Sequence, residues 1–186
     1  MKLVVIGAGL IGTSIALGAK RAGAEVELID ADGRAQKLAN DLVDSNKVTD
    51  PTIVVIATPT SALNGVIDRF KSLYPKSTFI DIGSTKTKVK VEVQNDLKFA
   101  ARFCPTHPMA GRELDGAEGA QSDLFVGKSW IITPLPETSG ESIVLVKELI
   151  EKLGARVIAM SPEDHDAAVA AVSHLPQVIS SLLAAQ

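Results

Sequence analysis

Two segments carry side chains that could do acid–base chemistry on a bound substrate. Gly83-Ser84-Thr85-Lys86 and Thr106-His107-Pro108 each follow a short apolar run typical of a buried strand. A neutral imidazole such as that of His107 can take the proton of a substrate hydroxyl while hydride leaves the same carbon, and Ser84 can hydrogen-bond that hydroxyl or the ring. The structural alternatives are Ser84 as a helix N-cap and His107 as a histidine bonded to loop backbone.

A glycine-rich segment near the N-terminus could bind the phosphates of a nucleotide. Gly7, Gly9 and Gly12 fit G-x-G-x-x-G, with Leu10 and Ile11 before the third glycine, and they stand between a strand-like and a helix-like run. The first glycine permits a tight turn, the second lets the backbone approach a pyrophosphate, and the third allows close helix–strand packing. We predict a dinucleotide-binding loop; an ordinary strand–helix turn is the alternative.

An acidic residue at the end of the next strand-like run bears on cofactor choice. Asp30 follows Gly12 at about the spacing of 20 residues that dinucleotide-binding domains use. Its carboxylate can accept hydrogen bonds from both ribose hydroxyls of NAD and would repel the 2′-phosphate of NADP. Arg34 is near enough to weaken that repulsion, so NAD is favoured and NADP stays open.

The third predicted strand ends in Ala57-Thr58-Pro59, and the fourth ends beside Gly83. In an open parallel sheet the carboxyl ends of the strands form the ligand crevice, so we assign these four residues to the cofactor site. Thr58 could contact the cofactor or cap the next helix.

The elements that must position these residues alternate along the chain. Strands are predicted at 2–7, 25–30, 51–59, 77–83, 101–108, 129–134 and 155–160, and helices at 10–22, 33–43, 60–74, 85–96 and 138–153. Such alternation predicts an α/β fold with a doubly wound, Rossmann-type, mostly parallel sheet over 1–160. Thr138 and Glu141 have capping-box spacing, Gly154 is a plausible helix stop, and the glycine-rich segment 110–127 resembles a surface loop beside a site.

The last segment, 161–186, is predicted to be a helix that opens a second, all-helical domain. Ser161 is its expected N-cap and Pro162 its first residue, and Pro176 is expected to kink it. An apolar stripe follows one face at three- and four-residue steps.

Composition excludes several classes of protein. The 186 residues are 46% hydrophobic and 22% charged, with a net charge of -3, so we expect neither a nucleic-acid nor a membrane partner. Cys104 is the single cysteine and cannot form an internal disulfide, which fits a cytoplasmic protein. No apolar run reaches membrane-spanning length, and the N-terminus does not have the pattern of a signal peptide.

Taken together, the motifs resemble one enzyme family. GAGLIG, ATP, DIGSTK, HPMAG, LFVGKSWIITP and SHLP occur in the order found in prephenate/arogenate dehydrogenases. HPMAG after DIGSTK is the specific part, because the glycine motif is shared with many oxidoreductases. The resemblance covers nearly the whole chain.

The resemblance implies an activity and site residues. His107 matches the family's catalytic histidine and Ser84 its partner at the substrate hydroxyl, while Ser173 and His174 match the mouth of the substrate pocket. The implied reaction is the NAD(P)-dependent oxidative decarboxylation of prephenate or arogenate to 4-hydroxyphenylpyruvate or tyrosine. Gln177 stands where the family often has histidine, a hint toward the alanyl side chain of arogenate. Full-length members continue into a helical domain that forms a homodimer.

Several alternatives remain. A 3-hydroxyacid dehydrogenase of the 6-phosphogluconate type shares the glycine motif, and a non-catalytic NAD-binding module is a further possibility. We expect no metal site, because Cys104 and His107 lack a second pair of ligands nearby. Cys104 is read as a core residue, and His165 and Lys86 as solvated residues at helix starts.

Overall fold

The computed structural model describes residues 1–111, 114, 116–174 and 180. Its strands are β1 (Lys2–Ile6), β2 (Glu25–Ile29), β3 (Ile53–Ile56), β4 (Thr78–Asp81), β5 (Phe103–Pro108), β6 (Ser129–Ile132) and β7 (Arg156–Ala159). They form one sheet in the order β2-β1-β3-β4-β5-β6-β7. The predicted strands all exist, each within a few residues of its expected bounds.

The helices follow the strands as predicted, with one addition. They are α1 (Leu10–Arg21), α2 (Gly33–Val43), α3 (Leu63–Phe70), α4 (Thr87–Val93), α5 (Leu97–Ala100), α6 (Gly140–Lys152) and α7 (Pro162–Val169), with short turns η1 (Thr60–Ala62), η2 (Ala117–Gly119) and the π-helical η3 (Ala170–His174). Helix α5 was not predicted; Asp96 caps it by accepting a hydrogen bond from Phe99 N.

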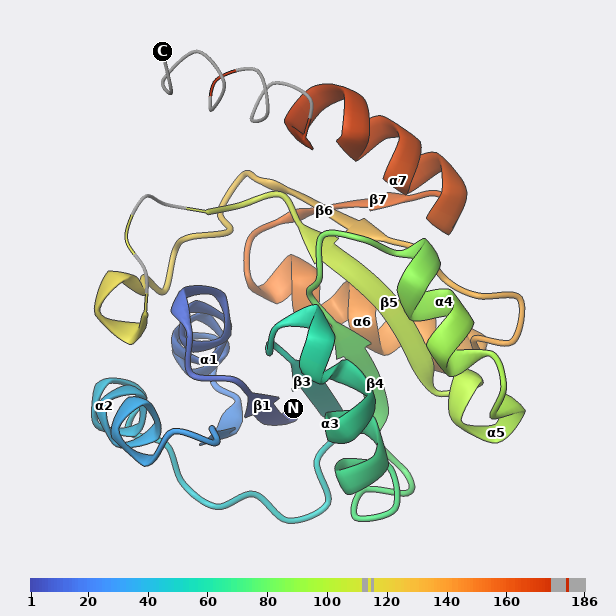
Figure 1. The fold of residues 1–186 in the computed structure, drawn as a ribbon. Coiled ribbons are helices and arrows are strands. Elements are labelled where there is room, and N and C mark those ends of the chain that lie inside the picture. Colours follow the sequence, from blue (N-terminus) through green and yellow to red (C-terminus); the bar gives the residue numbers. More distant parts are fainter. Residues whose placement is uncertain (112–113, 115, 175–179, 181–186) are drawn as a thin grey trace.

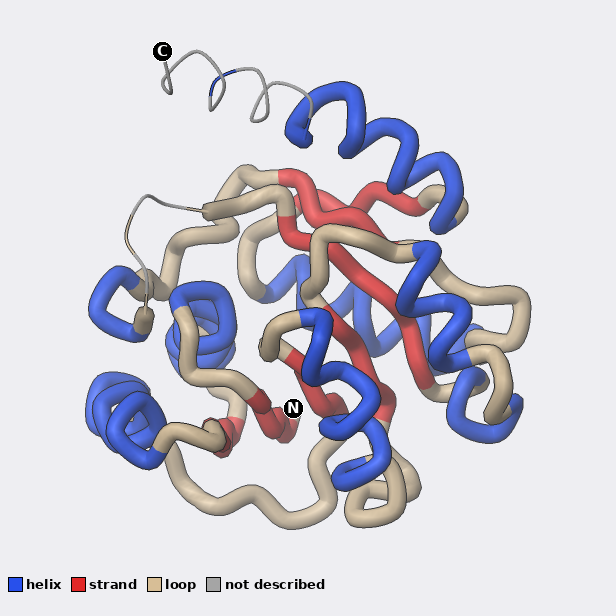
Figure 2. Tube along the Cα trace, in the orientation of Figure 1, coloured by secondary structure: helices blue, strands red, loops and turns tan. Residues whose placement is uncertain are grey.

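The sheet is covered on both faces (Figures 1 and 2). Because β1 is buried on both sides, its residues alternate between two cores: Leu3 and Val5 pack with α1, α2 and α6, whereas Val4 and Ile6 pack with α3, α4 and α5. Burial on both faces explains why the sequences of β1 and β3 are continuously apolar, whereas β2, which lies at the edge of the sheet, alternates.

The direction of the strands changes at one place. β1 to β5 are mutually parallel, β6 is antiparallel to β5, and β7 is parallel to β6. The register pairs Thr106 with Ile132 and Ile132 with Ala159, so β7 ends level with Thr106, within β5. The segment after β7 therefore starts beside the middle of β5, and α7 brings His165 to His107, which the expectation of parallel crossovers alone did not predict.

Capping residues confirm some helix boundaries and correct one. Ser139, not Thr138, caps α6 by accepting a hydrogen bond from Ser142 N, while Thr138 Oγ1 donates to Phe103 O. Gly154 adopts φ +79 after α6, in the left-handed region that a glycine stop requires. Ser161 accepts from Asp164 N and so caps α7, as predicted.

Helix α7 lies across the top of the molecule in Figure 1, beside β7 and α4. Glu163 forms an ion pair of 2.7 Å with Lys90 of α4, and Asp166 accepts hydrogen bonds from the start of that helix. The expected kink at Pro176 lies outside the described residues. In the part of the chain that is described, no helix has the length and apolarity to cross a bilayer.

Candidate active site

The glycine loop after β1 is shaped by steric contacts. Gly7 has φ +115, and a Cβ there would lie 2.4 Å from the carbonyl oxygen of Ala57; a Cβ on Gly12 would lie 2.1 Å from the carbonyl oxygen of Gly7. Gly9 has open space around its Cβ position and is the N-cap of α1, with no side-chain cap among the described residues. The loop thus leaves room at Gly9 and at the α1 N-terminus, as phosphate binding requires.

A cavity of about 730 Å³ opens at this loop, between the carboxyl ends of β1 and β3. The strand order reverses between these two strands, which is where doubly wound sheets bind ligands. Of the predicted cofactor residues, Gly7, Gly9, Asp30, Ala57, Thr58 and Pro59 line the cavity. Leu10, Ile11, Gly12, Arg34 and Gly83 are not among its lining residues.

Asp30 lies at the loop and is already engaged with backbone. Its carboxylate accepts hydrogen bonds from Ala8 N at 2.6 Å and from Asp32 N at 2.8 Å. Each carboxylate oxygen can accept a second bond, so these contacts fix the side chain at the cavity wall and leave acceptor capacity for a ligand.

Thr58 supports ligand binding more than helix capping. Its Oγ1 atom is buried without a hydrogen-bond partner among the described residues, and the side chain lines the cavity. The next helical turn, η1, has Pro59 as its N-cap and no side-chain cap within the described chain. A buried hydroxyl of this kind is costly unless a ligand or water satisfies it.

One wall of the cavity was not predicted, and it lies on α3 and the turn before it. Ala62, Gly65, Val66 and Arg69 share one helix face and line the cavity. Their three- and four-residue spacing was a usable signal, because small residues on one face leave space for a ligand. Arg69 also lies over the ring of Phe70, 5.1 Å from its centroid.

A second cavity, of about 270 Å³, contains the predicted chemical residues. It is lined by Ser84, His107, Pro108, Met109, Ala110, Gly111 and Val169. Met109, Ala110 and Gly111 line this cavity, and Gly116 lines the first one. The structure therefore brings Ser84 and His107 together at the sheet edge that carries the glycine loop.

Ser84 does not cap the following helix. The N-cap of α4 is Lys86, and the backbone N–H groups of Lys86 and Thr87 donate to Asp166 Oδ1 and Oδ2 at 2.8 and 2.9 Å. A carboxylate from α7 thus takes the capping role, and Ser84 is exposed at the cavity.

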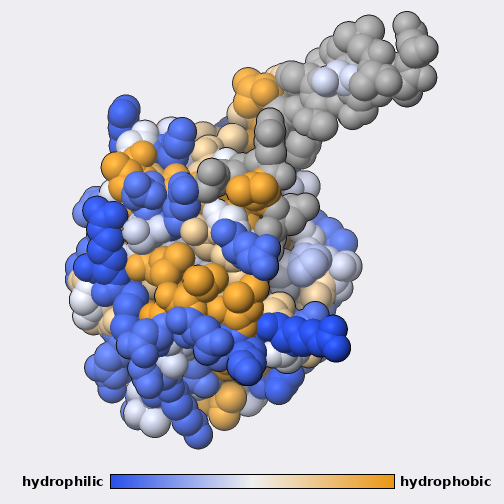
Figure 3. All heavy atoms as spheres, turned by 90° about the vertical axis from the view of Figure 1, so that its left-hand side faces the viewer, coloured by the Kyte–Doolittle hydropathy of each residue, from blue (hydrophilic) through white to orange (hydrophobic). Residues whose placement is uncertain are grey.

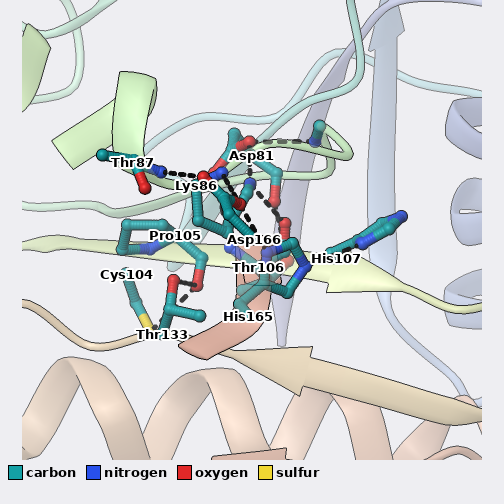
Figure 4. A network of polar contacts seen from close by, with 11 residues as sticks. Asp81, Lys86, Thr87, Cys104, Pro105, Thr106, His107, Thr133, His165 and Asp166 are labelled. Carbon is teal, nitrogen blue, oxygen red and sulfur yellow. Dashed lines mark hydrogen bonds and ion pairs between the residues drawn. The ribbon is translucent and has the colours of Figure 1, made fainter. Parts of the chain in front are cut away.

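His107 is bonded to another histidine. Its Nδ1 lies 2.9 Å from His165 Nε2, and His165 Nδ1 lies 2.8 Å from Asp166 Oδ1 (Figure 4). Burial alone would raise the pKa of Asp166, but hydrogen bonds from Thr87, Lys86 and His165 together hold it well below its usual range. The expectation that His165 is solvated was wrong: its side chain is fully buried, because α7 folds back onto β5.

Lys86 is also buried rather than solvated. Its Nζ is paired with the Asp81 carboxylate and donates to Thr106 O at 2.7 Å, and Thr106 N in turn donates to Asp81. Burial lowers the pKa of Lys86, while the Asp81 charge acts in the opposite direction. This buried pair fixes the end of β4 against the residue that precedes His107.

The other candidate residues lie in the core or at the end of the described chain. Cys104 is buried in the core as predicted, and burial raises the pKa of its thiol to about 12. Among the described residues no three His, Cys, Asp or Glu side chains converge as metal ligands. Ser173 and His174 belong to η3, but their side chains are not described, and Gln177 lies outside the described residues.

Fold and loop define a nucleotide-binding domain of the doubly wound α/β class. The chain matches, over residues 10–159, the family described as "Prephenate dehydrogenase, nucleotide-binding domain". It therefore belongs to the prephenate dehydrogenase family.

Relatives support the assignment. Prephenate dehydrogenase of Bacillus subtilis is 31% identical over 99% of this chain and 53% of its own. The Aquifex aeolicus prephenate dehydrogenase in complex with hydroxyphenyl propionate and NAD+ superposes with TM-score 0.90, at 28% identity, over 99% of this chain and 68% of that one. Synechocystis arogenate dehydrogenase gives 0.87, at 29% identity, over 98% and 68%. The chain thus spans about half the length of curated relatives such as that of Bacillus subtilis.

Proposed function

We propose that this chain is the cofactor-binding part of an NAD-dependent dehydrogenase that oxidatively decarboxylates prephenate or arogenate. The observation that carries the proposal is that His107 and Ser84 line one cavity at the edge of the sheet that carries the glycine loop. The named relatives act on these substrates, which supports the same substrate class here.

The residues around the first cavity fit a dinucleotide. Gly9 and the α1 N-terminus would hold the pyrophosphate, Asp30 the adenosine ribose, and the unpaired Thr58 hydroxyl would take a hydrogen bond from the cofactor or a water. Asp30 favours NAD, in line with the NAD+ in the Aquifex aeolicus complex. Arg34 and Arg69 are the residues that could accommodate the 2′-phosphate of NADP.

In the mechanism, this chain's residues position the substrate and move one proton. His107 takes the proton of the ring hydroxyl, and Ser84 hydrogen-bonds that hydroxyl. When bound, the nicotinamide supplies the hydride acceptor, and loss of CO2 makes the product ring aromatic. Met109, Ala110 and Val169 line the same cavity and would contact the substrate beside His107.

A second domain is expected to complete the substrate pocket. Segment 161–186 would begin it, with Ser173, His174 and Gln177 at the pocket mouth. By analogy with full-length members of the family, that domain would form a homodimer.

The test is an assay of NADH release by the product of the complete reading frame, with prephenate, arogenate and 3-hydroxyisobutyrate as substrates. We expect turnover of one or both ring substrates, and a loss of about 10²- to 10⁴-fold in kcat in His107→Asn, because general base catalysis contributes that much. Lys98→Ala, on α5 at the opposite edge of the sheet, is the matched control.

Two results would contradict the proposal. Turnover of 3-hydroxyisobutyrate alone would assign another substrate class. NAD binding that His107→Asn leaves unchanged, together with no activity on any substrate, would indicate a non-catalytic nucleotide-binding module.

A further inference from the structure

Three buried or half-buried groups follow one another from α4 to the second cavity. The α4 backbone at Lys86 and Thr87 donates to Asp166, Asp166 contacts His165 Nδ1, and His165 Nε2 contacts His107 Nδ1. The two rings are nearly perpendicular, with 70° between their planes and 5.1 Å between their centroids. Figure 4 shows Asp166 and His165 beside the end of β5, where His107 lies.

The ionised state of Asp166 sets the protons along this row. Because its pKa lies well below the usual range, Asp166 is a carboxylate at neutral pH and can only accept hydrogen bonds. His165 must therefore present a proton on Nδ1, and a neutral His165 then has a lone pair on Nε2. The contact between His165 Nε2 and His107 Nδ1 is then a hydrogen bond only if His107 Nδ1 carries a proton. A neutral His107 with its proton on Nδ1 has its lone pair on Nε2.

We propose that His165 and Asp166 are positioning residues that hold His107 in the Nδ1–H tautomer, with Nε2 as the base for the substrate hydroxyl. The proposal rests on the function proposed above and goes beyond it, because it concerns how α7 prepares the base. When His107 Nε2 takes the hydroxyl proton, the imidazolium keeps its Nδ1–H bond to His165, and the Asp166 carboxylate lies one ring away from the new charge.

Burial of His165 favours one tautomer over the other. The His165 side chain is fully buried, so water does not compete for its two nitrogens. An imidazole in water populates both tautomers, whereas a ring held between a carboxylate and a second imidazole populates one. The same contact seats α7 on the sheet, so the base is set only when α7 is docked.

The direct test reads the tautomers without substrate or cofactor. The 186-residue chain is labelled with 15N-histidine, and long-range 1H–15N correlation spectra are recorded at about pH 8, above the ordinary pKa of histidine. The three histidines are assigned with single His→Gln variants. We expect protonated Nδ1 and unprotonated Nε2 in both His107 and His165. A proton on Nε2 of His107, or averaged shifts like those of free imidazole, overturns the proposal.

Variants of the acidic residue add a matched comparison. Asp166→Asn should remove the tautomer preference of His165 and His107, because an amide can donate to Nδ1 as well as accept. Asp164→Asn removes a charge from the same turn of α7 but leaves the contact to His165, since Asp164 bonds Ser161. Preference lost in both variants, or in neither, contradicts the role of Asp166.

Steady-state kinetics of the enzyme encoded by the complete reading frame distinguish a positioning role of His165 from a merely structural one. His165→Leu should lower kcat about 10- to 100-fold with KM nearly unchanged, because the base is present but not held. His165→Gln keeps an acceptor oxygen for His107 Nδ1 and should recover most of the loss. Equal losses in the two variants would mean that His165 only fills space. An inactive wild-type enzyme with the expected tautomers would instead reject the proposed function.

Discussion

A buried ion pair lies next to Ser84 and His107, the side chains proposed to act on substrate. Lys86, Asp81 and Thr106 form a closed set of contacts under the cavity that contains His107 and Ser84. A buried ion pair is costly to form but far more costly to break, because removing one partner leaves an uncompensated charge in the core. These residues therefore give rigidity to the end of β4 and β5 rather than chemistry.

We predict that Lys86→Met lowers the free energy of unfolding by about 3–5 kcal/mol, since the Asp81 carboxylate would be left buried and unpaired. Urea denaturation followed by circular dichroism measures the change. Lys88→Met, at an exposed position of the same helix, should change stability by less than about 0.5 kcal/mol. A similar loss in both variants would show that the buried pair is not the cause.

Elements of regular structure meet at two joints that decide function. The β1–α1 turn depends on three glycines with different surroundings, and the α4–α7 contact depends on one carboxylate at the start of a helix. Each joint gives a prediction that separates binding or docking from folding.

At the first joint, Gly9→Ala should fold normally and bind NAD at least about tenfold more weakly, because its Cβ enters only the space proposed for the pyrophosphate. Gly12→Ala should instead lose about 1–3 kcal/mol of stability, since its Cβ overlaps the carbonyl oxygen of Gly7. Calorimetric titration with NAD and thermal melts measure the two effects. Unchanged NAD affinity in Gly9→Ala would place the nucleotide elsewhere.

At the second joint, stability should depend on pH through Asp166. Its folded-state pKa is depressed, so its contribution is present above the unfolded value of about 3.9 and is lost as pH falls from there toward the folded value. The difference in unfolding free energy between the wild type and Asp166→Asn should thus be large at pH 7 and shrink below about pH 4. Glu163→Gln, which alters the exposed pair with Lys90, is the control. A difference that grows on acidification would reverse the assigned sign.

At the scale of the whole molecule, the sheet and its helices form the walls of two cavities, one at the glycine loop and one at Ser84 and His107. An apolar area bordered by hydrophilic side chains faces the viewer in Figure 3, on the side where α1 and α2 lie in Figure 1. The chain spans about half the length of the Bacillus subtilis relative. The cofactor site is thus proposed to be whole here, and the substrate site to be shared with further residues.

We therefore expect the 186-residue chain to bind NAD but not to turn over prephenate or arogenate. NAD at 100 times its Kd should add about 2.7 kcal/mol to the free energy of unfolding and raise the melting temperature accordingly. Differential scanning fluorimetry and an NADH absorbance assay on the same sample check both statements. Substantial turnover by this chain alone would show that its cavity suffices for catalysis.

The sequence by itself determined the order of the strands and of the helices other than α5, the glycine loop with Asp30, and the placement of Ser84 and His107 at one edge of the sheet. These follow from local pattern, because hydrophobic runs, glycines and capping residues act over a few positions. The sequence likewise predicted Pro162 at the start of α7 and Gly154 at the end of α6.

Only the tertiary structure decided what Lys86, His165 and Asp166 do. As isolated residues at helix starts they resemble solvated charges, and no local pattern pairs α4 with a helix 80 residues later. Because β6 and β7 run opposite to β5, β7 ends level with Thr106. This register is a long-range property, and it allows α7 to bury His165 against His107. The wall of the cavity on α3 was decided partly by packing. The spacing of Ala62, Gly65 and Arg69 indicates that they share one helix face, but that face borders a cavity because β1 and β3 lie side by side.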